Sequence, residues 1–567
     1  MSLISEDNGS GRLQLSLTRI VVVWFVLIVL TCLLVSRLFW IQVIHPEKLI
    51  SEGNSRVLRS YHYEPPRGLI TDRNGKILAI SVPVKNVAAD PKRLEEEGFF
   101  DKNGALDEIS TILEIDKATL AKKLQDRSRR FVHLKNYLDP NKATLLKNIS
   151  KTGFVLQDSY LRHYPTGEAN ANLVGILNGE GVGVYGVEQS FNSYLSSKAS
   201  TSYAKKDIYN HIVENIGQIK GSTGGNIILS IDNRLQSYAY QSLKNTVLEN
   251  DADSGSAVLI DVQSGEILAM VNAPSFDPNN RKSFDSSNAK NRAVTEIFEP
   301  GSTMKPIVAL SALENKSTNW GEVFDTRPFV VDGKMVRDSH AMSEGTLLDI
   351  IRYSSNTGMA HLSMRLGPQK IMQTITKFGF GQKTSSGLVG ESPGKLNQNR
   401  NFWSEIDKAT LGFGYGIAVT NLQLASAYAT LANGGMKVPV SILRLSKNPQ
   451  SSLVADPRQV ANMKLALETV VSDGTGAKAA IDRYRVAGKT GTAKIATSGG
   501  YGKYYMSTFA GFAPISKPRF ALVVVINAPK AGKFYGGVVS GPVFREVMSR
   551  ALQLYNVKPD REMVKGN

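Results

Sequence analysis

The stretch EPGSTMKP, residues 299–306, carries the strongest local signal in the sequence. Its turn dipeptide Pro-Gly leads into the apolar, helix-favouring run 307–310, so a serine stands where a helix is expected to begin. Pro306 is compatible with that helix because the N–H groups of a first turn have no intrahelical partner. Residues three apart lie on one face of a helix. The Ser302 hydroxyl and the Lys305 amine are therefore predicted to face the same space, as a nucleophile and a base.

A Ser-x-x-Lys pair alone is weak evidence, because a helix cap followed by a surface lysine explains an isolated match. Two further motifs follow it, Ser354-Ser355-Asn356 and the run KTGT at residues 489–492. The order Ser-x-x-Lys, Ser-x-Asn, Lys-Thr-Gly is typical of class A β-lactamases and penicillin-binding proteins. Their middle motif has aspartate where this sequence has Ser355, so only its outer positions match.

The chemistry explains these residue types. Serine is a poor nucleophile unless an adjacent base takes its proton, and Lys305 can do so only when it is neutral. Burial and a second cation both disfavour an ammonium ion, and Lys489 is the predicted second cation. Ser354 is expected to relay protons between the base and the leaving group. The Asn356 amide is expected to hold a peptide group of the substrate.

The run at residues 489–492 reads as an edge strand of small side chains, beside which a substrate chain can lie. Lys489 and Thr490 are expected to meet a substrate carboxylate. Gly491 and Thr492 complete the predicted substrate-binding edge. The backbone N–H groups of Ser302 and Thr492 are expected to form an oxyanion hole.

Composition limits the other possibilities. The chain has 567 residues, enough for two or three domains, with 67 basic and 50 acidic residues and a formal net charge of +17. A basic solvated surface is the simplest explanation, and an anionic cell-wall polymer or membrane surface also suits it. No nucleic-acid motif is present, so nucleic acid is not an expected partner. The single cysteine, Cys32, excludes an intrachain disulfide, and no metal site or cofactor is expected.

The N-terminal segment reads as a membrane anchor. Seventeen residues from Ile20 carry no charge, and after Arg37 the apolar character continues, so residues 20–44 are predicted to span a bilayer. Signal peptides have shorter cores and small-residue cleavage sites, which favours an uncleaved anchor over a signal peptide. A buried helix of a soluble protein is the alternative. Residues 1–19 form a short polar tail, and the balance of basic residues around the span does not decide the orientation.

Residues 45–222 are predicted to form an elongated, non-catalytic pedestal of mixed strands and helices. Asn74-Gly75 between apolar runs indicates a hairpin. Residues 92–150 have helical patterning, with an apolar face made of Leu113, Ile115, Leu120 and Leu124. The glycine-rich stretch at residues 221–225 marks the boundary with a second domain, residues 223–560.

The second domain is predicted to be an antiparallel sheet flanked by helices, with an all-helical lobe, which makes the whole chain α+β. Its expected elements are a strand at 227–231, a hairpin of 256–262 and 266–272, helices between about 305 and 472, strands at 485–493, 507–513 and 520–526, and a helix at 541–556. Ser302 would then lie where the sheet meets the helical lobe, opposite the strand of Lys489.

With these residues placed, the sequence resembles the class B penicillin-binding proteins, and most of all their division-specific branch in Gram-negative bacteria. The most specific shared motifs outside the site are RGLITDRNG at 67–75, GVYGVE at 183–188 and GSAVLID at 255–261. The resemblance implies a cytoplasmic N-terminus, a periplasmic pedestal of the class B dimerisation type and a penicillin-binding transpeptidase domain. It also implies the inner membrane and partners such as an FtsW-type glycosyltransferase and other division proteins, bound through the membrane helix and the pedestal.

By the same resemblance, Ser302 attacks the penultimate D-Ala carbonyl of a stem pentapeptide, D-Ala leaves, and an amine of a neighbouring strand resolves the acyl-enzyme. β-Lactams would acylate Ser302 in the same way. Lys305 takes the part of the base, with Ser354, Asn356 and Lys489 as further catalytic groups. Tyr415 and Tyr535 stand in stretches that resemble those near the family's active site, although core packing explains each of them equally well.

Several alternatives are weaker or stay open. A class A synthase would need a glycosyltransferase domain where the pedestal motifs stand, and a β-lactamase would need a deacylating glutamate that cannot be placed here. A β-lactam sensor would need an intracellular effector, which a nineteen-residue tail does not hold. An elongation-type class B transpeptidase with a RodA-type partner, and a chiefly non-catalytic scaffold that activates a glycosyltransferase, both stay open.

Overall fold

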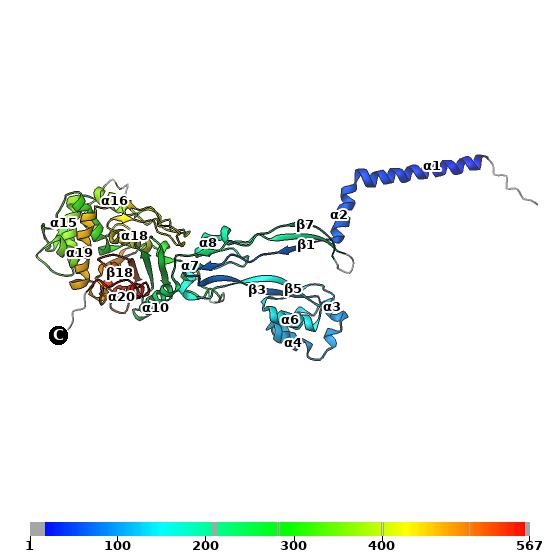
Figure 1. Cartoon of the computed structure of the whole chain (residues 1–567), viewed down its shortest axis with the longest axis horizontal. Coiled ribbons are helices and arrows are strands. Elements are labelled where there is room, and N and C mark those ends of the chain that lie inside the picture. Colours follow the sequence, from blue (N-terminus) through cyan, green and yellow to red (C-terminus); the bar gives the residue numbers. More distant parts are fainter. Residues whose placement is uncertain are drawn as a thin grey trace, which may run out of the picture. The chain divides into compact units, whose positions relative to one another are not determined.

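The computed structural model describes residues 17–206, 212–280, 282, 284–397, 400, 402–497 and 499–561. The chain divides into two compact units (Figure 1). One unit comprises residues 1–65 and 198–222, and the other comprises residues 66–197 and 223–567. Most of the predicted tail, residues 1–16, lies outside the described residues.

The first unit holds the apolar N-terminal helix and a small sheet. α1 (Leu17–Phe39) continues into the π-helical turn η1 (Trp40–Ile44), and together they form the single helix, among the described residues, that is long and apolar enough to cross a membrane. This helix is compatible with the predicted single-pass anchor, and it begins three residues earlier than expected. α2 (Pro46–Val57) leads into an antiparallel sheet with the order β1 (Leu58–Tyr63), β6 (Ser200–Lys206), β7 (Ile212–Ile219).

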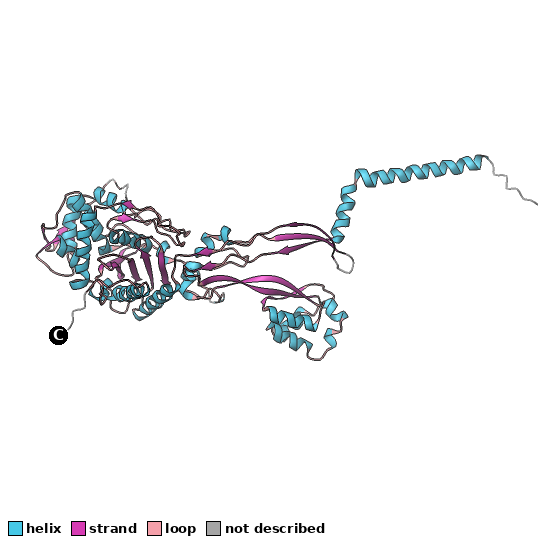
Figure 2. Ribbon diagram, viewed as in Figure 1, coloured by secondary structure: helices cyan, strands magenta, loops and turns pink. Residues whose placement is uncertain are grey.

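The second unit begins with a long two-stranded ribbon. β3 (Ile77–Ala89) pairs along most of its length with β5 (Phe154–His163), and at one end it also pairs with β4 (Val132–Leu138). Helices gather around this end (Figure 2) and share its core: α3 (Pro91–Glu96), α4 (Ala105–Leu113), α5 (Lys117–Lys123) and α6 (Pro140–Ile149). Three residues of the apolar face predicted for residues 92–150, Leu113, Leu120 and Leu124, are buried, and Ile115 is partly buried. The helical prediction was wrong for β4, whose inward Leu134 and Leu138 contribute to the same core.

The hairpin predicted at Asn74-Gly75 is confirmed, because β2 (Ile70–Thr71) pairs antiparallel with the start of β3. Gly75 has φ +83°, which favours glycine, and the buried Asp72 accepts hydrogen bonds from the backbone N–H of Asn74 and of Lys76, both at 2.8 Å. The other Asp72 oxygen accepts from the backbone N–H of Asn233, at the start of α10 (Asn233–Glu249). The turn therefore connects the ribbon to the C-terminal part of the same unit.

The remaining short elements complete this region. β8 (Ile227–Ile228) pairs in parallel with β2. Short helices follow β5 and precede the nucleophile: α7 (Glu168–Val174), α8 (Gly186–Ser190), α9 (Asn192–Leu195), α11 (Ser286–Ala289) and α12 (Arg292–Thr295).

A five-stranded antiparallel sheet forms the centre of the C-terminal part, in the order β10-β9-β19-β18-β17. Its strands are β9 (Ser254–Asp261), β10 (Ile267–Ala273), β17 (Ala487–Thr497), β18 (Gly500–Ala513) and β19 (Phe520–Asn527). The predicted hairpin and the three predicted late strands are confirmed, although β17 and β18 are longer than the apolar alternation indicated. β17 is an edge strand.

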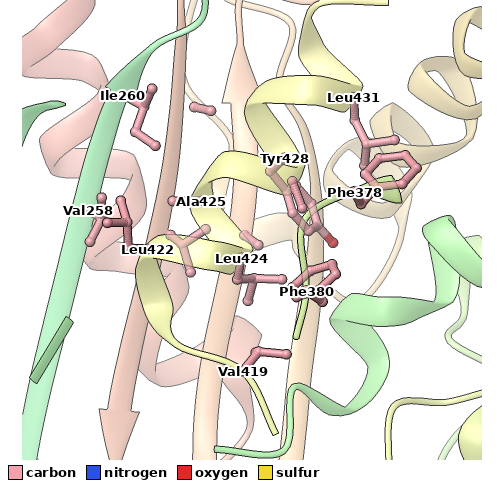
Figure 3. Packing of buried hydrophobic residues seen from close by; sticks show 14 of the residues in the cluster. Val258, Ile260, Phe378, Phe380, Val419, Leu422, Leu424, Ala425, Tyr428 and Leu431 are labelled. Atoms are coloured by element: carbon pink, nitrogen blue, oxygen red, sulfur yellow. The ribbon is translucent and has the colours of Figure 1, made fainter. Parts of the chain in front are cut away.

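Helices cover both faces of this sheet. On one face, α10 and α20 (Gly536–Leu554) pack over one core, and α20 begins five residues before the predicted position. On the other face, α18 (Asn421–Ala432) lays Leu422 and Ala425 towards Val258 and Ile260 of β9 (Figure 3). This second core also contains α13 (Lys305–Glu314) and α19 (Pro457–Asp473).

The helical lobe is less purely helical than predicted. Its further helices are α14 (Leu347–Arg352), α15 (Asn356–Leu366), α16 (Pro368–Lys377) and α17 (Glu405–Leu411). Six short strands interrupt the expected helical range: β11 (Val323–Asp325), β12 (Phe329–Val331), β13 (Lys334–Val336), β14 (Glu344–Thr346), β15 (Met436–Lys437) and β16 (Ser452–Leu453). They are two or three residues long, which is too short for a period of alternating residues to be visible in the sequence.

Candidate active site

Ser302 lies in a single 3-10 turn, η4 (Gly301–Met304), directly before α13. The serine thus precedes the α-helix that was predicted to begin with it, and Pro306 occupies the first turn as expected. Two hydrogen bonds fix the turn: Thr303 Oγ1 donates to the Pro300 carbonyl at 2.7 Å, and the buried Tyr428 hydroxyl of α18 donates to the Thr303 carbonyl at 2.8 Å. The core in Figure 3 therefore supports the nucleophile turn through Tyr428.

A second loop lies against this turn. The Gly301 N–H donates to the Gly414 carbonyl at 3.2 Å, and a Cβ at Gly414 would lie 2.2 Å from the Gly301 carbonyl oxygen. Gly414 also has φ +83°. Glycine is thus required at position 414 both by the close approach and by the backbone conformation.

Lys305 is completely buried and its amine has three oxygen partners. Lys305 Nζ donates to the Ser354 carbonyl at 2.5 Å, to Asn356 Oδ1 at 2.8 Å and to Ser354 Oγ at 3.2 Å. Among the residues that the structure describes, no hydrogen bond joins Lys305 to Ser302. The structure therefore brings the first two motifs together through the lysine rather than through the predicted serine-lysine pair.

The surroundings of Lys305 lower its pKa well below the ordinary value, first through burial and then through the positive charge of Lys489. The Asp338 carboxylate acts in the opposite direction. Lys489 is also completely buried, and burial lowers its pKa to about 7. Burial therefore disfavours the ammonium form of both lysines, and at Lys305 the positive charge of Lys489 disfavours it further.

The Ser354 loop has a strained backbone and a carboxylate anchor. Ser354 has φ +62°, a left-handed conformation that is uncommon for a residue other than glycine. Asp338 accepts hydrogen bonds from Ser355 Oγ at 2.5 Å, Asn356 N–H at 2.5 Å, Thr357 N–H at 3.0 Å and Thr357 Oγ1 at 2.8 Å. Asp338 thereby fixes the start of α15, which carries Asn356.

The edge strand β17 packs against the nucleophile turn. A Cβ at Gly491 would lie 2.9 Å from Thr303 Cγ2, so a side chain there would push the two segments apart. Thr490 Oγ1 lies 2.8 Å from Thr475 Oγ1, and Thr492 Oγ1 accepts a hydrogen bond from the Gly536 N–H at 3.0 Å. The predicted substrate-binding residues therefore lie beside Ser302, on a strand with a free edge.

Tyr415 and Tyr535 differ in their surroundings. The Tyr415 hydroxyl accepts a hydrogen bond from the Lys494 N–H of β17 at 3.3 Å, and its ring also packs in a small apolar cluster. Tyr535 occupies the N-cap position of α20 without a side-chain capping hydrogen bond and is 53% exposed, so core packing does not account for it.

Three contributors to this site carried no recognisable sequence signal: Asp338, Tyr428 and Glu299. Asp338 is 18 residues from Asn356, Tyr428 is 125 residues from Thr303, and Glu299 contacts Gly416 across 117 residues. Glu299 lies within the stretch at residues 299–306, but its partner Gly416 does not. Only a map of spatial contacts could have identified these residues.

The sequence matches two protein families. Residues 255–549 match the family described as the penicillin binding protein transpeptidase domain, and residues 62–229 match the penicillin-binding protein dimerisation domain. The second match contains the ribbon of β3 and β5, and the first contains every predicted site residue.

Known proteins align over nearly the whole chain. "Peptidoglycan D,D-transpeptidase FtsI" of Escherichia coli K12 is 40% identical over 530 residues, covering 93% of this chain and 90% of the relative. "Probable peptidoglycan D,D-transpeptidase PenA" of Neisseria gonorrhoeae is 33% identical, covering 99% and 97%. The crystal structure of penicillin binding protein 3 from Mycobacterium tuberculosis complexed with aztreonam superposes with a TM-score of 0.68 at 26% identity, covering 89% of this chain and 99% of that one.

Proposed function

The chain belongs to the class B penicillin-binding proteins, with a dimerisation domain and a transpeptidase domain, and from this premise we propose that it cross-links septal peptidoglycan as a serine D,D-transpeptidase. Its substrates are stem peptides that end in D-Ala-D-Ala. Its product is a peptide bond between two neighbouring strands of the cell wall.

In the proposed reaction, Ser302 Oγ attacks the carbonyl carbon of the penultimate D-Ala while neutral Lys305 takes the hydroxyl proton. The C–N bond to the terminal D-Ala breaks, and the proton reaches that leaving amine through Ser354. The donor is then held as an ester of Ser302. An amine of a second strand attacks this ester, its proton returns to the serine oxygen, and the cross-link leaves.

The buried Lys305 amine is the observation that carries this proposal. It lies within hydrogen-bonding distance of Ser354 Oγ and Asn356 Oδ1, and its pKa is lowered by burial and by Lys489. A neutral lysine can act as a base, whereas an ammonium ion cannot.

The free edge of β17 suits an extended donor peptide. The donor would pair with the backbone of this strand, its terminal carboxylate near Lys489 and Thr490. Gly491 leaves room for the close approach, and the N–H groups of Ser302 and Thr492 would stabilise the oxyanion. β-Lactams would enter the same groove and acylate Ser302.

The cellular setting is part of the proposal. Residues 1–19 would be cytoplasmic, residues 20–44 would span the inner membrane, residues 45–222 would form a periplasmic pedestal, and residues 223–560 would form the transpeptidase domain. The membrane helix and the pedestal are the proposed binding sites for an FtsW-type glycosyltransferase and other division proteins.

Intact-mass spectrometry after exposure to benzylpenicillin tests the proposed nucleophile. The native protein is expected to gain one drug mass on the Ser302 peptide, and Ser302→Ala is expected to gain none. If no adduct forms and the drug stays intact, the proposed active site is contradicted. If no adduct forms and the drug is hydrolysed, the protein is a β-lactamase. In cells, a Ser302→Ala protein that still supports division would favour the scaffold role instead.

A further inference from the structure

Glu299, three residues before Ser302, has a carboxylate that the proposed reaction does not use. Its Oε1 accepts hydrogen bonds from the Gly416 N–H at 2.8 Å and from the Tyr501 hydroxyl at 3.3 Å. Its Oε2 is buried and, within the described part of the chain, has no hydrogen-bond partner. No lysine or arginine among the described residues forms an ion pair with it. Burial of a carboxylate without a cation is unfavourable, and it raises the Glu299 pKa above its ordinary value.

Two tyrosines connect this carboxylate to the substrate-binding strand. The rings of Tyr415 and Tyr501 meet edge to face with centroids 5.4 Å apart. The Tyr415 hydroxyl accepts a hydrogen bond from the Lys494 N–H, and the Tyr501 hydroxyl donates to Glu299. The group of Glu299, Tyr415 and Tyr501, here called the acidic pocket, therefore adjoins β17 at Lys494.

The proposed path of the donor leads to this position. With the terminal carboxylate beside Thr490 and the reacting carbonyl beside Thr492, the donor chain continues along β17 towards Lys494. Strands advance by roughly 3.3 Å per residue, so the residue just before D-Ala-D-Ala lies one to two residues beyond Thr492, alongside Ala493 and Lys494. Its side chain is the part of the donor that can reach the acidic pocket.

From this arrangement we infer that the acidic pocket binds the side-chain ammonium of a diamino acid that immediately precedes D-Ala-D-Ala in the donor peptide. The inference rests on the proposed function. Glu299 Oε2, unpartnered within the described residues, would accept a hydrogen bond from the ammonium. The tyrosine rings supply further attraction for a cation. The ammonium displaces the Tyr501 hydroxyl, which is held only by a 3.3 Å contact and belongs to a residue that is 53% exposed.

A contact between Glu299 and the donor ammonium would serve the cross-linking reaction. When two stem peptides are cross-linked through a side-chain amine, the donor peptide and the acceptor peptide both carry that amine. The donor therefore brings its own amine into the site. A carboxylate beside that amine favours its protonated form, which is not a nucleophile. Glu299 would thus distinguish the donor amine, bound and charged, from the acceptor amine that attacks the ester.

A purely structural role for Glu299 makes a different prediction. The bond from the Gly416 N–H needs only one neutral acceptor oxygen, which glutamine also provides. If Glu299 only supported the 414–416 loop, the native protein would react with charged and neutral donors at equal rates, and so would the Glu299→Gln variant. The relative rate for two donors that differ only in charge separates the two roles.

The test uses the full chain in detergent and two thioester donors with Nα-acetyl-L-lysyl-D-alanyl as the acyl group and thioglycolate as the leaving group. One donor has a free lysine ε-ammonium, and in the other this group is acetylated. Acylation of Ser302 breaks the C–S bond, and kcat/KM is followed by release of the thiol. Glu296→Gln is the matched control, because it removes a carboxylate from the same segment. Unlike Glu299 in the described chain, Glu296 is half-exposed and has a cationic partner, Arg292, at 3.2 Å.

The native protein and Glu296→Gln are expected to prefer the charged donor by at least about tenfold, and Glu299→Gln is expected to lose this preference. Because the result is a ratio within each variant, a general loss of rate does not affect it. Equal rates for the two donors in the native protein, a preference that persists in Glu299→Gln, or no consumption of either donor while benzylpenicillin still acylates Ser302 would each overturn the acidic pocket alone. Absence of the benzylpenicillin adduct on Ser302 would instead overturn the proposed function, and the inference with it.

Discussion

Two of the clusters in which the protein buries charged side chains have opposite arrangements. In the ribbon region, the Glu188 side chain is 0% exposed and each of its oxygens lies 2.7 Å from a guanidinium nitrogen, one of Arg67 and one of Arg162. In the active site, Lys305 and Lys489 are equally buried, but they carry the same sign and neither forms an ion pair with a carboxylate of the described chain.

The first cluster stabilises the fold, whereas the second contributes to the reaction. Opposite charges in contact keep each other ionised, and removing one partner leaves the others buried without compensation. Burial and the like charge of Lys489 together outweigh the opposing effect of Asp338, so Lys305 can lose its proton well below the ordinary lysine pKa. We therefore expect changes in the first cluster to alter stability, and changes in the second to alter rate and its dependence on pH.

The largest effect is expected for Lys305→Gln, which leaves a polar group in place but cannot accept the serine proton. The rate of acylation by benzylpenicillin should fall roughly 10²–10⁴-fold, the usual contribution of a general base. Intact-mass time courses measure this rate. Lys316→Gln, at an exposed lysine just after the same helix, is the control and should behave like the native protein. A Lys305→Gln protein that acylates within tenfold of the native rate would rule out Lys305 as the base.

Glu188→Gln should lower the local free energy of unfolding by about 3–5 kcal/mol, because two buried guanidinium groups lose their anion. Hydrogen exchange of the β3 and β5 amides measures this free energy. Glu95→Gln is the matched control: its ion pair with Arg127 is about half exposed on both sides and should contribute roughly 0–1 kcal/mol. Equal effects of the two changes would show that burial of the pair is unimportant.

A smaller effect is expected for Asp338→Asn, which replaces a carboxylate that accepts four hydrogen bonds. An amide can accept only at its oxygen, so about two bonds are lost, each worth roughly 0.5–1.5 kcal/mol. The acylation rate should fall about tenfold, because the loop that carries Ser354 and Asn356 loses its anchor. The same change removes an anion that raises the Lys305 pKa, so the rate should rise with pH at a lower pH than in the native protein. A shift to higher pH would contradict this assignment.

The catalytic motifs could be predicted because each is complete within a few residues. The Lys-Thr-Gly strand, the Ser-x-Asn turn and the serine turn each identify themselves locally, and the hairpins at Asn74-Gly75 and at residues 254–273 are equally local. The contacts that assemble these motifs were not predictable. Lys305 bonds to Ser354 and Asn356 across about fifty residues, and Asp338 follows a three-residue strand with no sequence signal.

The same limit applies to the charge clusters. Arg67 and Glu188 are 121 residues apart, and each stood in a motif that could be recognised without showing that the two residues touch. The depressed pKa of Lys305 was anticipated from the need for a neutral base. Its burial among Ser354, Asn356 and Lys489 became visible only when β17 and α15 were placed against the nucleophile turn.

The pH dependence of Ser302 acylation by benzylpenicillin, in the native full chain and in Lys489→Met, tests most directly whether buried like charges create the base. The rate should rise with pH as Lys305 loses its proton, with a midpoint well below the ordinary lysine pKa of 10.5. Lys489→Met removes the neighbouring cation while keeping an unbranched side chain, so the Lys305 pKa should rise and the midpoint should move to higher pH. A native midpoint near 10.5, or a midpoint that stays in place or falls in Lys489→Met, would contradict the account.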